Sequence, residues 1–266
     1  LGGIRPDQAV MPPSLPGRTV RPSAKEQPMN KTVIALALGA AAALPSQALV
    51  VTQWNFNSPT PDNNTATGTT VPSIGTGTAS LVGGVTSPGF NSGVGSSDPA
   101  AADNSGWQTS NYPASGSGNG TAGVQFMVST KGLTGISISY DLRHSNTSSR
   151  FGKLQYTLNG TTFTDLVNFE ANLGGDTWYN GRTADLTGIA GANDNASFGF
   201  RVVSTFAPGT NAYAPSTSTA NYGTTGTWRF DMVTVNAVAA IPEPQTYALM
   251  LSGLLAVAFM ARRRRG

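Results

Sequence analysis

Segments in which apolar and polar residues alternate are the feature that most constrains the fold of this chain. Between residues 136 and 143, Ile136, Ile138, Tyr140 and Leu142 alternate with polar or charged residues. Side chains of a β-strand point to opposite faces in turn, so a period of two predicts a half-buried strand. Before residue 241, only residues 33–44 look helical, and no stretch has the spacing of a long amphipathic helix. The sequence therefore predicts an all-β body.

The same alternation predicts further strands. They are expected around residues 124–128, 153–158, 163–169, 198–202 and 228–232. Asn159-Gly160 predicts a hairpin between residues 153–158 and residues 163–169, because both turn residues tolerate a positive φ. Residues 50–56 are expected to pair with the last strand, and residues 79–85 to form a short one. The core is expected to contain Ile138, Tyr140, Phe200, Val202, Trp228 and Phe230.

Residues 57–122 and 205–227 are rich in Gly, Thr, Ser, Asn and Pro and are expected to form long loops. Turn signals between short strands favour an antiparallel β-sandwich of jelly-roll type. The pattern that ends in Trp228-Arg229-Phe230-Asp231 is similar to the β-jelly-roll bodies of other secreted bacterial proteins. That resemblance implies a fold and no activity.

Three signals follow one another at residues 241–266. Pro242-Glu243-Pro244 is a rigid tripeptide, residues 247–261 are uncharged and apolar, and Arg262, Arg263, Arg264 and Arg265 form a basic run. At ~1.5 Å rise per residue, the apolar part would be a helix of about 22 Å, compared with the ~30 Å of a bilayer core. With Tyr247 at one interface and the arginines at the cytoplasmic one, we predict a transmembrane helix.

This order of signals resembles the PEP-CTERM sorting signal of proteins exported by Gram-negative bacteria. The resemblance implies recognition by an exosortase, a membrane-embedded protease that resembles a transpeptidase. It also implies association with exopolysaccharide and biofilm material. An ordinary single-pass tail anchor is the alternative, and the Pro-Glu-Pro tripeptide favours sorting.

Residues 29–48 have the pattern of a Sec signal peptide, which implies the Sec translocon and signal peptidase as partners. Lys31 precedes the apolar residues 33–44, and small residues at Ser46 and Ala48 predict cleavage after Ala48. Residues 1–28 are polar and rich in Pro and Arg. We expect translation to start at Met29 rather than Met11, which makes residues 1–28 an over-extended, disordered leader.

The expected exported body, residues 49–240, has a different charge from the whole chain. The chain is formally +3, but the body has seven basic and ten acidic residues and is therefore −3, with no basic run. Binding to a phosphate backbone requires clustered Lys and Arg, so nucleic acid is excluded as a partner. The absence of Cys from the sequence excludes thiol catalysis and Cys-ligated metals.

Few residues of the body suggest chemistry. His144 is the only histidine and has no nucleophile motif beside it, so it is interpreted as a polar residue at a strand end. Glu170 with Asp176 or Asp185 would suit a glycosidase only if their carboxylates face each other. The residues 62–64 (Asp-Asn-Asn) and Asp194 offer oxygen ligands to calcium, but they lack the spacing of a calcium loop. No cofactor is predicted, and calcium is the one ion under consideration.

Aromatic residues suggest a sugar-binding surface. Trp54 and Trp228 are interpreted as core residues, whereas Trp107 and Tyr112 are expected in a loop, where they are the candidates for glycan contact. We predict a non-enzymatic surface or extracellular-matrix protein, first anchored in the inner membrane and then released or held at the cell surface. The alternative is a carbohydrate-binding module or a weak glycan-active enzyme.

Overall fold

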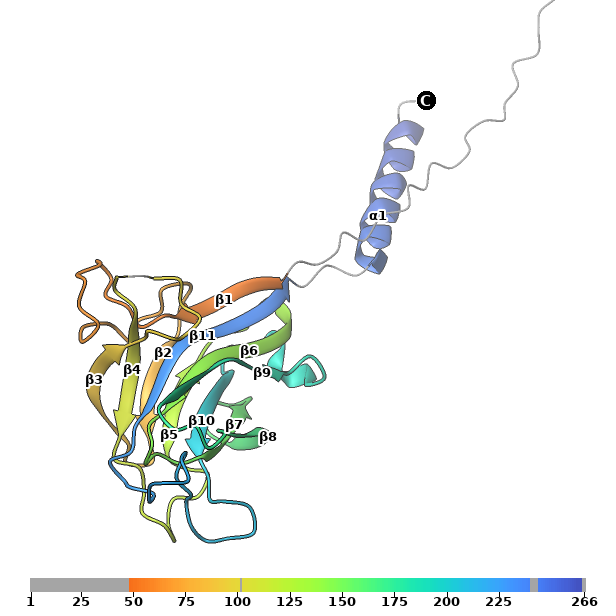
Figure 1. The fold of residues 1–266 in the computed structure, drawn as a ribbon. Helices are drawn as coiled ribbons and strands as arrows, with labels where there is room; N and C mark the ends of the chain where they lie inside the picture. The colour runs from red at the N-terminus through yellow and green to blue at the C-terminus, as the bar shows by residue number, and fades with distance from the viewer. Residues whose placement is uncertain (1–47, 101, 240–243, 265–266) are drawn as a thin grey trace, which may run out of the picture. The chain divides into compact units, whose positions relative to one another are not determined.

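The computed structural model describes residues 48–100, 102–239 and 244–264. Eleven strands, one short 3-10 helix and one α-helix occur in these ranges (Figure 1). The elements are β1 (Ala48–Trp54), β2 (Thr78–Val82), β3 (Thr86–Ser92), β4 (Ser105–Ser110), β5 (Gly123–Met127), β6 (Leu133–His144), β7 (Phe151–Thr157), β8 (Phe163–Glu170), β9 (Thr177–Asp185), η1 (Ala190–Ala192), β10 (Gly199–Ser204), β11 (Trp228–Ala239) and α1 (Pro244–Arg263).

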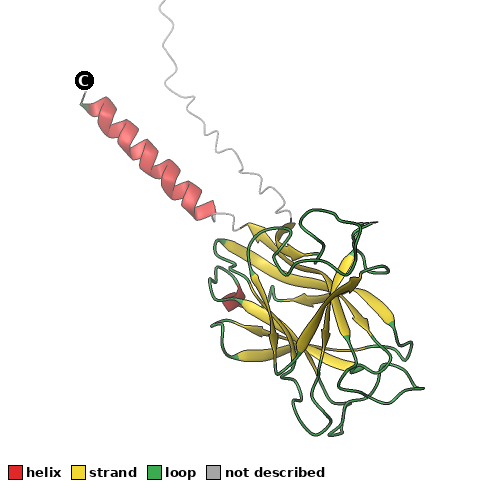
Figure 2. Cartoon of the chain, turned by 90° about the vertical axis from the view of Figure 1, so that its left-hand side faces the viewer, coloured by secondary structure: helices red, strands yellow, loops and turns green. Residues whose placement is uncertain are grey.

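The strands form two antiparallel sheets that pack face to face (Figures 1 and 2). The six-stranded sheet has the order β3-β4-β11-β6-β9, and β1 pairs with the far half of β11. The five-stranded sheet has the order β2-β5-β10-β7-β8. This arrangement confirms the predicted all-β sandwich, while the jelly-roll type stays a prediction.

The core lies between the two sheets and contains the expected residues. Ile138, Tyr140, Phe200, Val202, Trp228 and Phe230 are all at most 3 % exposed. Aromatic rings fill much of the space: Phe126 of β5 stacks on Phe200 of β10 with centroids 5.0 Å apart, and Trp54 of β1 lies 5.0 Å from Phe126. The alternation of the sequence therefore identified the inward faces of both sheets.

Two predicted pairings are confirmed. β1 pairs with β11 over Ala48 to Trp54, so the first and last strands of the body are neighbours. β7 and β8 form the hairpin at Asn159-Gly160, where Gly160 has a φ of +78° and the Asn159 side chain accepts the backbone N–H groups of Thr161 and Thr162. The hairpin follows from local sequence, because a residue with a positive φ is required at such a turn.

Other predictions about the loops were wrong. Residues 57–122 contain three strands, of which only β2 was expected, and β9 was missed as well. β3 contains Pro88 and Gly89, and β9 contains Gly181 at a φ of +63°, so neither has an unbroken alternation. These strands form because they pair with the edges of an existing sheet, at β4 and β6 respectively. Such tertiary pairing overrides a weak local preference.

A helix was predicted for the apolar residues 247–261; α1 confirms it and is longer, from Pro244 to Arg263, with Arg262 and Arg263 in its last turn. Among the residues that the structure describes, no helix is long and apolar enough to cross a membrane. The leader at 1–28, the signal helix with its Ser46, and Pro242, Glu243 and Arg265 lie outside the described residues. Ala48, after which cleavage was predicted, is the first residue of β1.

Candidate functional site

A row of polar residues crosses the outer face of the five-stranded sheet. In register, one residue comes from each strand in the order β2, β5, β10, β7 and β8. The row consists of Ser80, Gln125, Arg201, Gln155 and Asp165, and we call it the polar row. The neighbouring residues of each central strand point into the core, for example Phe200 and Val202 on either side of Arg201. The sandwich therefore fixes the direction of every side chain in the row.

Hydrogen bonds join three residues of the polar row, Arg201, Gln155 and Asp165, into one network. Nε of Arg201 donates to Oε1 of Gln155 at 2.5 Å, and Nε2 of Gln155 donates to Oδ1 of Asp165 at 2.6 Å. Nζ of Lys153, two residues before Gln155 on the same face, donates to the other Asp165 oxygen at 2.6 Å. The bond from Lys153, followed by that from Gln155, lowers the pKa of Asp165, so this carboxylate stays charged at neutral pH.

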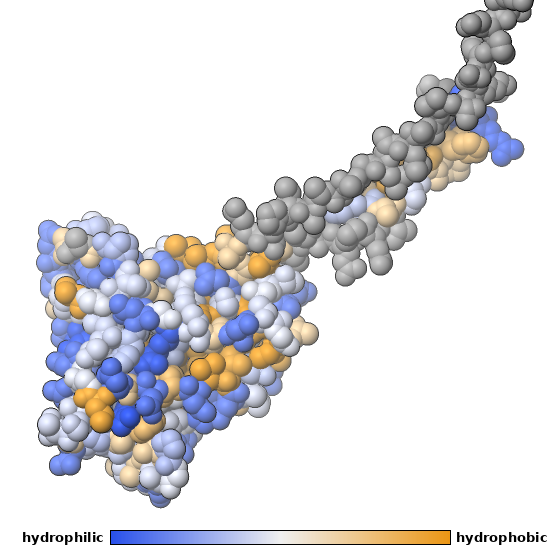
Figure 3. All heavy atoms as spheres, turned by 45° about the vertical axis from the view of Figure 1, so that its right-hand side comes forward, coloured by the Kyte–Doolittle hydropathy of each residue, from blue (hydrophilic) through white to orange (hydrophobic). Residues whose placement is uncertain are grey.

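Two features flank the polar row: the aromatic ring of Phe163 and a hollow in the surface beside Lys153. The Arg201 guanidinium lies 4.2 Å from the centroid of the Phe163 ring, which keeps the arginine flat against the sheet. The first three residues of β7, which include Lys153, and residues 205–210 line a hollow of about 320 Å³ that also reaches Asn168 and Phe169. The visible face of the β-body in Figure 3 is largely hydrophilic, with separate apolar patches. Fixed donors and acceptors next to a hollow are suited to binding a hydroxyl-rich ligand.

The two aromatic residues predicted for glycan contact are placed differently. Trp107 lies in β4, not in a loop, and is 5 % exposed; its indole N–H donates to the Ser87 hydroxyl. Tyr112 follows β4 and is 2 % exposed, with its hydroxyl 2.7 Å from that of Thr109. The prediction that a sugar could reach these rings was wrong. Both rings pack in the core, Trp107 against Phe56 and Tyr112 against Trp228.

His144 lies in the core at the end of β6. Its Nδ1–H donates to the Ser149 carbonyl oxygen at 2.9 Å, and its ring has the rings of Phe169, Tyr179 and Trp228 around it. Burial, with a smaller effect from the Arg182 charge, lowers the pKa of His144 to about 3. A neutral histidine without a nucleophile next to it fits packing. The sequence predicted the strand end correctly, but it did not predict that His144 would be buried.

The carboxylates considered for catalysis or calcium have separate partners. Glu170 pairs with Arg150, Asp176 with Arg143, and Asp185 accepts the backbone N–H of Thr187. Asp62 and Asp194 accept backbone N–H groups of Asn64 and Gly132, as turn residues do. Within the described residues, no three His, Asp or Glu side chains form a group that could hold a metal.

The C-terminal segment is the part of the chain that resembles a known family. The PEP-CTERM protein-sorting motif matches residues 240–265, which include the tripeptide, α1 and the arginines. Residues 240–265 are a PEP-CTERM sorting motif. A protein with this motif is exported, anchored transiently at the membrane and then processed to the cell surface. The motif also implies recognition by an exosortase, as the sequence predicted.

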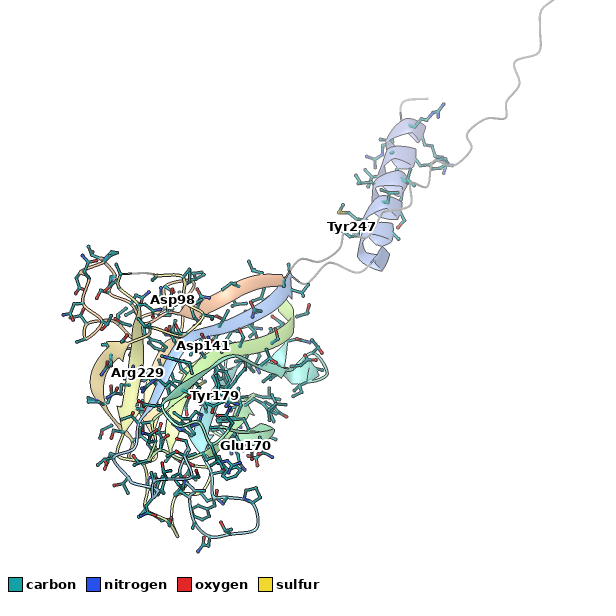
Figure 4. The ribbon with its side chains drawn as sticks, viewed as in Figure 1. Asp98, Asp141, Glu170, Tyr179, Arg229 and Tyr247 are labelled. Carbon is teal, nitrogen blue, oxygen red and sulfur yellow. The ribbon has the colours of Figure 1, made fainter. Side chains whose placement is uncertain are left out.

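The structure describes part of the PEP-CTERM motif. α1 begins at Pro244, where proline is well tolerated because the first helical N–H has no partner within the helix. Arg262 and Arg263 end the helix, which places positive charge at the negative end of the helix dipole. Tyr247, labelled in Figure 4, lies in the first turns. In the sequence, the tripeptide, the apolar segment and the basic run thus follow one another in the order that the motif requires.

Solved structures that resemble the β-body share little sequence with it, and no curated protein matches the chain. The CBM22-1 xylan-binding domain of Paenibacillus barcinonensis Xyn10C is 12 % identical, with 61 % of this chain and 87 % of that chain covered and a TM-score of 0.35. The K1 cleaved adhesin domain of Lys-gingipain from Porphyromonas gingivalis W83 is 13 % identical, with 63 % and 100 % covered and a TM-score of 0.32. At these TM-scores, function has to be argued from this chain's own residues.

Sequence reasoning missed the polar row. A signal was present, because Gln125, Gln155 and Arg201 each interrupt an apolar strand with a large polar residue. That signal gives the face on which each residue lies but not the register between strands. Only the pairing of β5, β10 and β7 brings the three residues into one line.

Proposed function

We propose that this chain is a non-enzymatic surface or matrix protein, which an exosortase processes and whose β-body binds exopolysaccharide through the polar row. The sorting motif delivers the body to the outside of the cell, where polysaccharide is the abundant polymer. The observation that carries the ligand class is the network of Arg201, Gln155 and Asp165 on a sheet face. Sugar hydroxyls both donate and accept hydrogen bonds, so a row that offers both is complementary to them.

Two features support binding rather than catalysis. The polar row contains a single carboxylate, Asp165, whereas glycoside hydrolysis needs two at a separation of roughly 5–9.5 Å. Each carboxylate weighed for such a pair has its own partner elsewhere, as for Glu170 with Arg150. The alternative of a weak glycan-active enzyme is therefore less well supported than that of a carbohydrate-binding body.

Glycan binding is tested with a matched pair of lysine variants of the full chain. Lys153 and Lys131 each pair with an aspartate, at 2.6 Å and 3.5 Å, but only Lys153 lies beside the polar row. We expect Arg201→Ala and Lys153→Ala to weaken binding to exopolysaccharide from the producing cells by about tenfold each, because a hydrogen bond to a charged group contributes ~1.5 kcal/mol or more. Titration calorimetry measures this.

The control variant Lys131→Ala should bind as the wild type does. Equal binding by all four proteins would mean that any glycan site lies elsewhere on the body. Release of reducing ends from the polysaccharide during the titration would favour the enzymatic alternative over the binding one.

Processing is tested at Glu243, the one charged residue between the body and the arginines. We expect Glu243→Ala to give an unprocessed, membrane-retained protein while export continues, because the Pro-Glu-Pro tripeptide would lose its only charge for recognition. Glu170→Ala is the matched control, since it removes a glutamate from the body, and it should be processed normally. Intact-mass analysis of cell and medium fractions decides between the outcomes. A wild-type protein that still ends at Gly266 in the cell fraction, with no shortened species in the medium, would indicate an ordinary anchor.

A further inference from the structure

A buried carboxylate on the outer face of the six-stranded sheet has an oxygen without a partner. Asp231 of β11 is 0 % exposed; its Oδ1 accepts the N–H of Met232 at 2.7 Å, and its Oδ2 has no partner with good hydrogen-bond geometry, although the Ser96 hydroxyl lies close enough to this carboxyl group to favour its charged form. β11 bulges at this point: Met232 has a φ of +47°, and the register to β6 shifts between Asp231 and Thr234. Bulges and strained residues of this kind re-aim side chains, often at functional sites.

A second unpartnered oxygen comes from the residue before β4. Asn104 is 5 % exposed, and its Nδ2 donates to the Ser96 hydroxyl and the Asp98 carbonyl oxygen, both at 3.4 Å. Those bonds fix the orientation of the amide, whose Oδ1 is buried without a partner. A Cβ added to Gly93 would lie 1.7 Å from this Oδ1 and 2.8 Å from Oδ2 of Asp231. The two free oxygens are therefore at most about 4.5 Å apart, close enough to share one ion.

The surroundings of these oxygens are negative. Residues 93–98, which we call the covering loop, lie over the sheet here, and the N–H of Ser97 donates to Asp141 of β6 at 2.5 Å. Asp98 and Asp141 both act on Asp231, and Figure 4 labels these two residues on this side of the body. Burial raises the pKa of Asp231 to about 8, with smaller contributions from Asp98 and Asp141, while hydrogen bonds from the Ser96 hydroxyl and the Met232 N–H act in the opposite direction.

Positive charge does not offset this group within the described residues. Four ion pairs occur there, and none includes Asp98, Asp141 or Asp231. The nearby Arg229 uses its guanidinium for the Ser92 carbonyl oxygen and the Gln108 side chain instead. A buried charged carboxylate without a cation is costly, so Asp231 holds a proton at neutral pH, which a bound cation would displace.

We propose that Oδ2 of Asp231 and Oδ1 of Asn104 bind a calcium ion between β11 and the covering loop. Calcium takes six to eight oxygen ligands, including carboxylates, amides, backbone carbonyls and water, in flexible geometry. A mixed set of one carboxylate and one amide agrees with the lack of any group of three His, Asp or Glu metal ligands among the described residues. The ion would fasten the covering loop to the sheet once the body is outside the cell.

This site is distinct from the positions that the sequence suggested for calcium. Asp62 and Asp194 are turn residues with bonded oxygens, as described above. Asp103 is a second buried carboxylate with two unpartnered oxygens, and burial with the neighbouring Asp62 raises its pKa. The neighbour of Asp103 is the exposed Asp62 rather than the amide of Asn104. Asp103 is therefore the alternative calcium ligand that the experiment has to distinguish from Asp231.

The test is a calcium titration of the metal-free full chain near pH 7, followed by thermal unfolding and by equilibrium dialysis with radioactive calcium. We expect one ion per wild-type chain and a Tm increase of about 5–10 °C at a hundredfold excess over Kd. Asp231→Asn and Asn104→Ala should lose both the ion and the shift. Asn104→Asp should keep both, because a carboxylate replaces the amide ligand. The control Asp185→Asn, at an exposed aspartate, should behave as the wild type.

Without calcium, Asp231→Asn should be about as stable as the wild type near pH 7, since a neutral amide of the same shape replaces a carboxyl group that is protonated there. A variant that keeps its stability without the ion but no longer responds to it is what a cation site predicts. Retained binding in Asp231→Asn would overturn the proposal, as would binding lost only in Asp103→Asn, which would place the ion beside Asp62. Absence of any ion on the wild-type chain would overturn it as well.

Discussion

Replacement of Trp228 by Ala is expected to lower the free energy of unfolding by about 3–5 kcal/mol. Trp228 is the first residue of β11 and is 0 % exposed. Its ring packs against those of Tyr112, His144, Phe169 and Phe230, with centroids 5.2–6.3 Å away. Truncation therefore removes a large apolar surface and leaves a cavity between rigid strands, which cannot close around it.

Part of this loss is due to a hydrogen bond, which a second variant separates. The indole N–H donates to the Ser149 carbonyl oxygen at 3.0 Å. Trp228→Phe keeps most of the ring volume and loses that bond, so we expect it to cost about 1–2 kcal/mol. Denaturant unfolding followed by far-UV circular dichroism measures both variants. Equal costs for Ala and Phe would show that the bond and not the packing dominates.

The core could be predicted from sequence because alternation reports directly on burial. Ile138 and Tyr140 are two positions apart in β6, Phe200 and Val202 are two positions apart in β10, and all four are buried. Strands whose pattern is broken, such as β9 with Gly181, could not be predicted, because their stability comes from pairing with β6 rather than from their own residues. A sequence pattern does not predict a strand whose stability comes mainly from pairing with a neighbouring strand.

The candidate sites were less predictable for a related reason. Asp231 and Asn104 are 127 positions apart in the sequence and meet only because β4 pairs with β11. Trp107 was misplaced because its neighbours are Gly, Ser and Gln, which indicate a loop, although β4 lies between β3 and β11. The sorting motif, by contrast, is contiguous, so residues 241–266 could be recognised without a fold.

Acid lability is the second large effect, and we expect it to depend on His144. The pKa of His144 is lowered to about 3 by burial and by the Arg182 charge, whereas an unfolded histidine has a pKa of ~6.5. Between these values the unfolded chain binds a proton that the folded chain does not. Stability is therefore complete above pH ~6.5 and falls as the pH is lowered, by up to ~1.4 kcal/mol per pH unit and ~5 kcal/mol in all.

His144→Phe should remove this loss while keeping a ring in the same packing. At pH 8 we expect its stability to be within ~1 kcal/mol of the wild type, because the Ser149 carbonyl oxygen keeps its bond from Trp228. At pH 4.5 the variant should gain about 2–3 kcal/mol over the wild type relative to pH 8. Comparison of the two proteins cancels groups common to both, including Asp231, whose raised pKa has the opposite effect on stability in this range.

Tyr179→Phe is the matched control, since the Tyr179 ring meets that of His144 edge-on at 5.4 Å but does not titrate below pH 8. Its stability should change with pH in parallel with the wild type. Urea unfolding at half-unit steps from pH 8 to 4.5 provides the three curves. If the His144→Phe curve also runs parallel to the wild type, His144 gains its proton in the folded protein near pH 6.5. The cage of Phe169, Tyr179 and Trp228 would then admit water or move aside, and the packing argued for this end of the sandwich would be wrong.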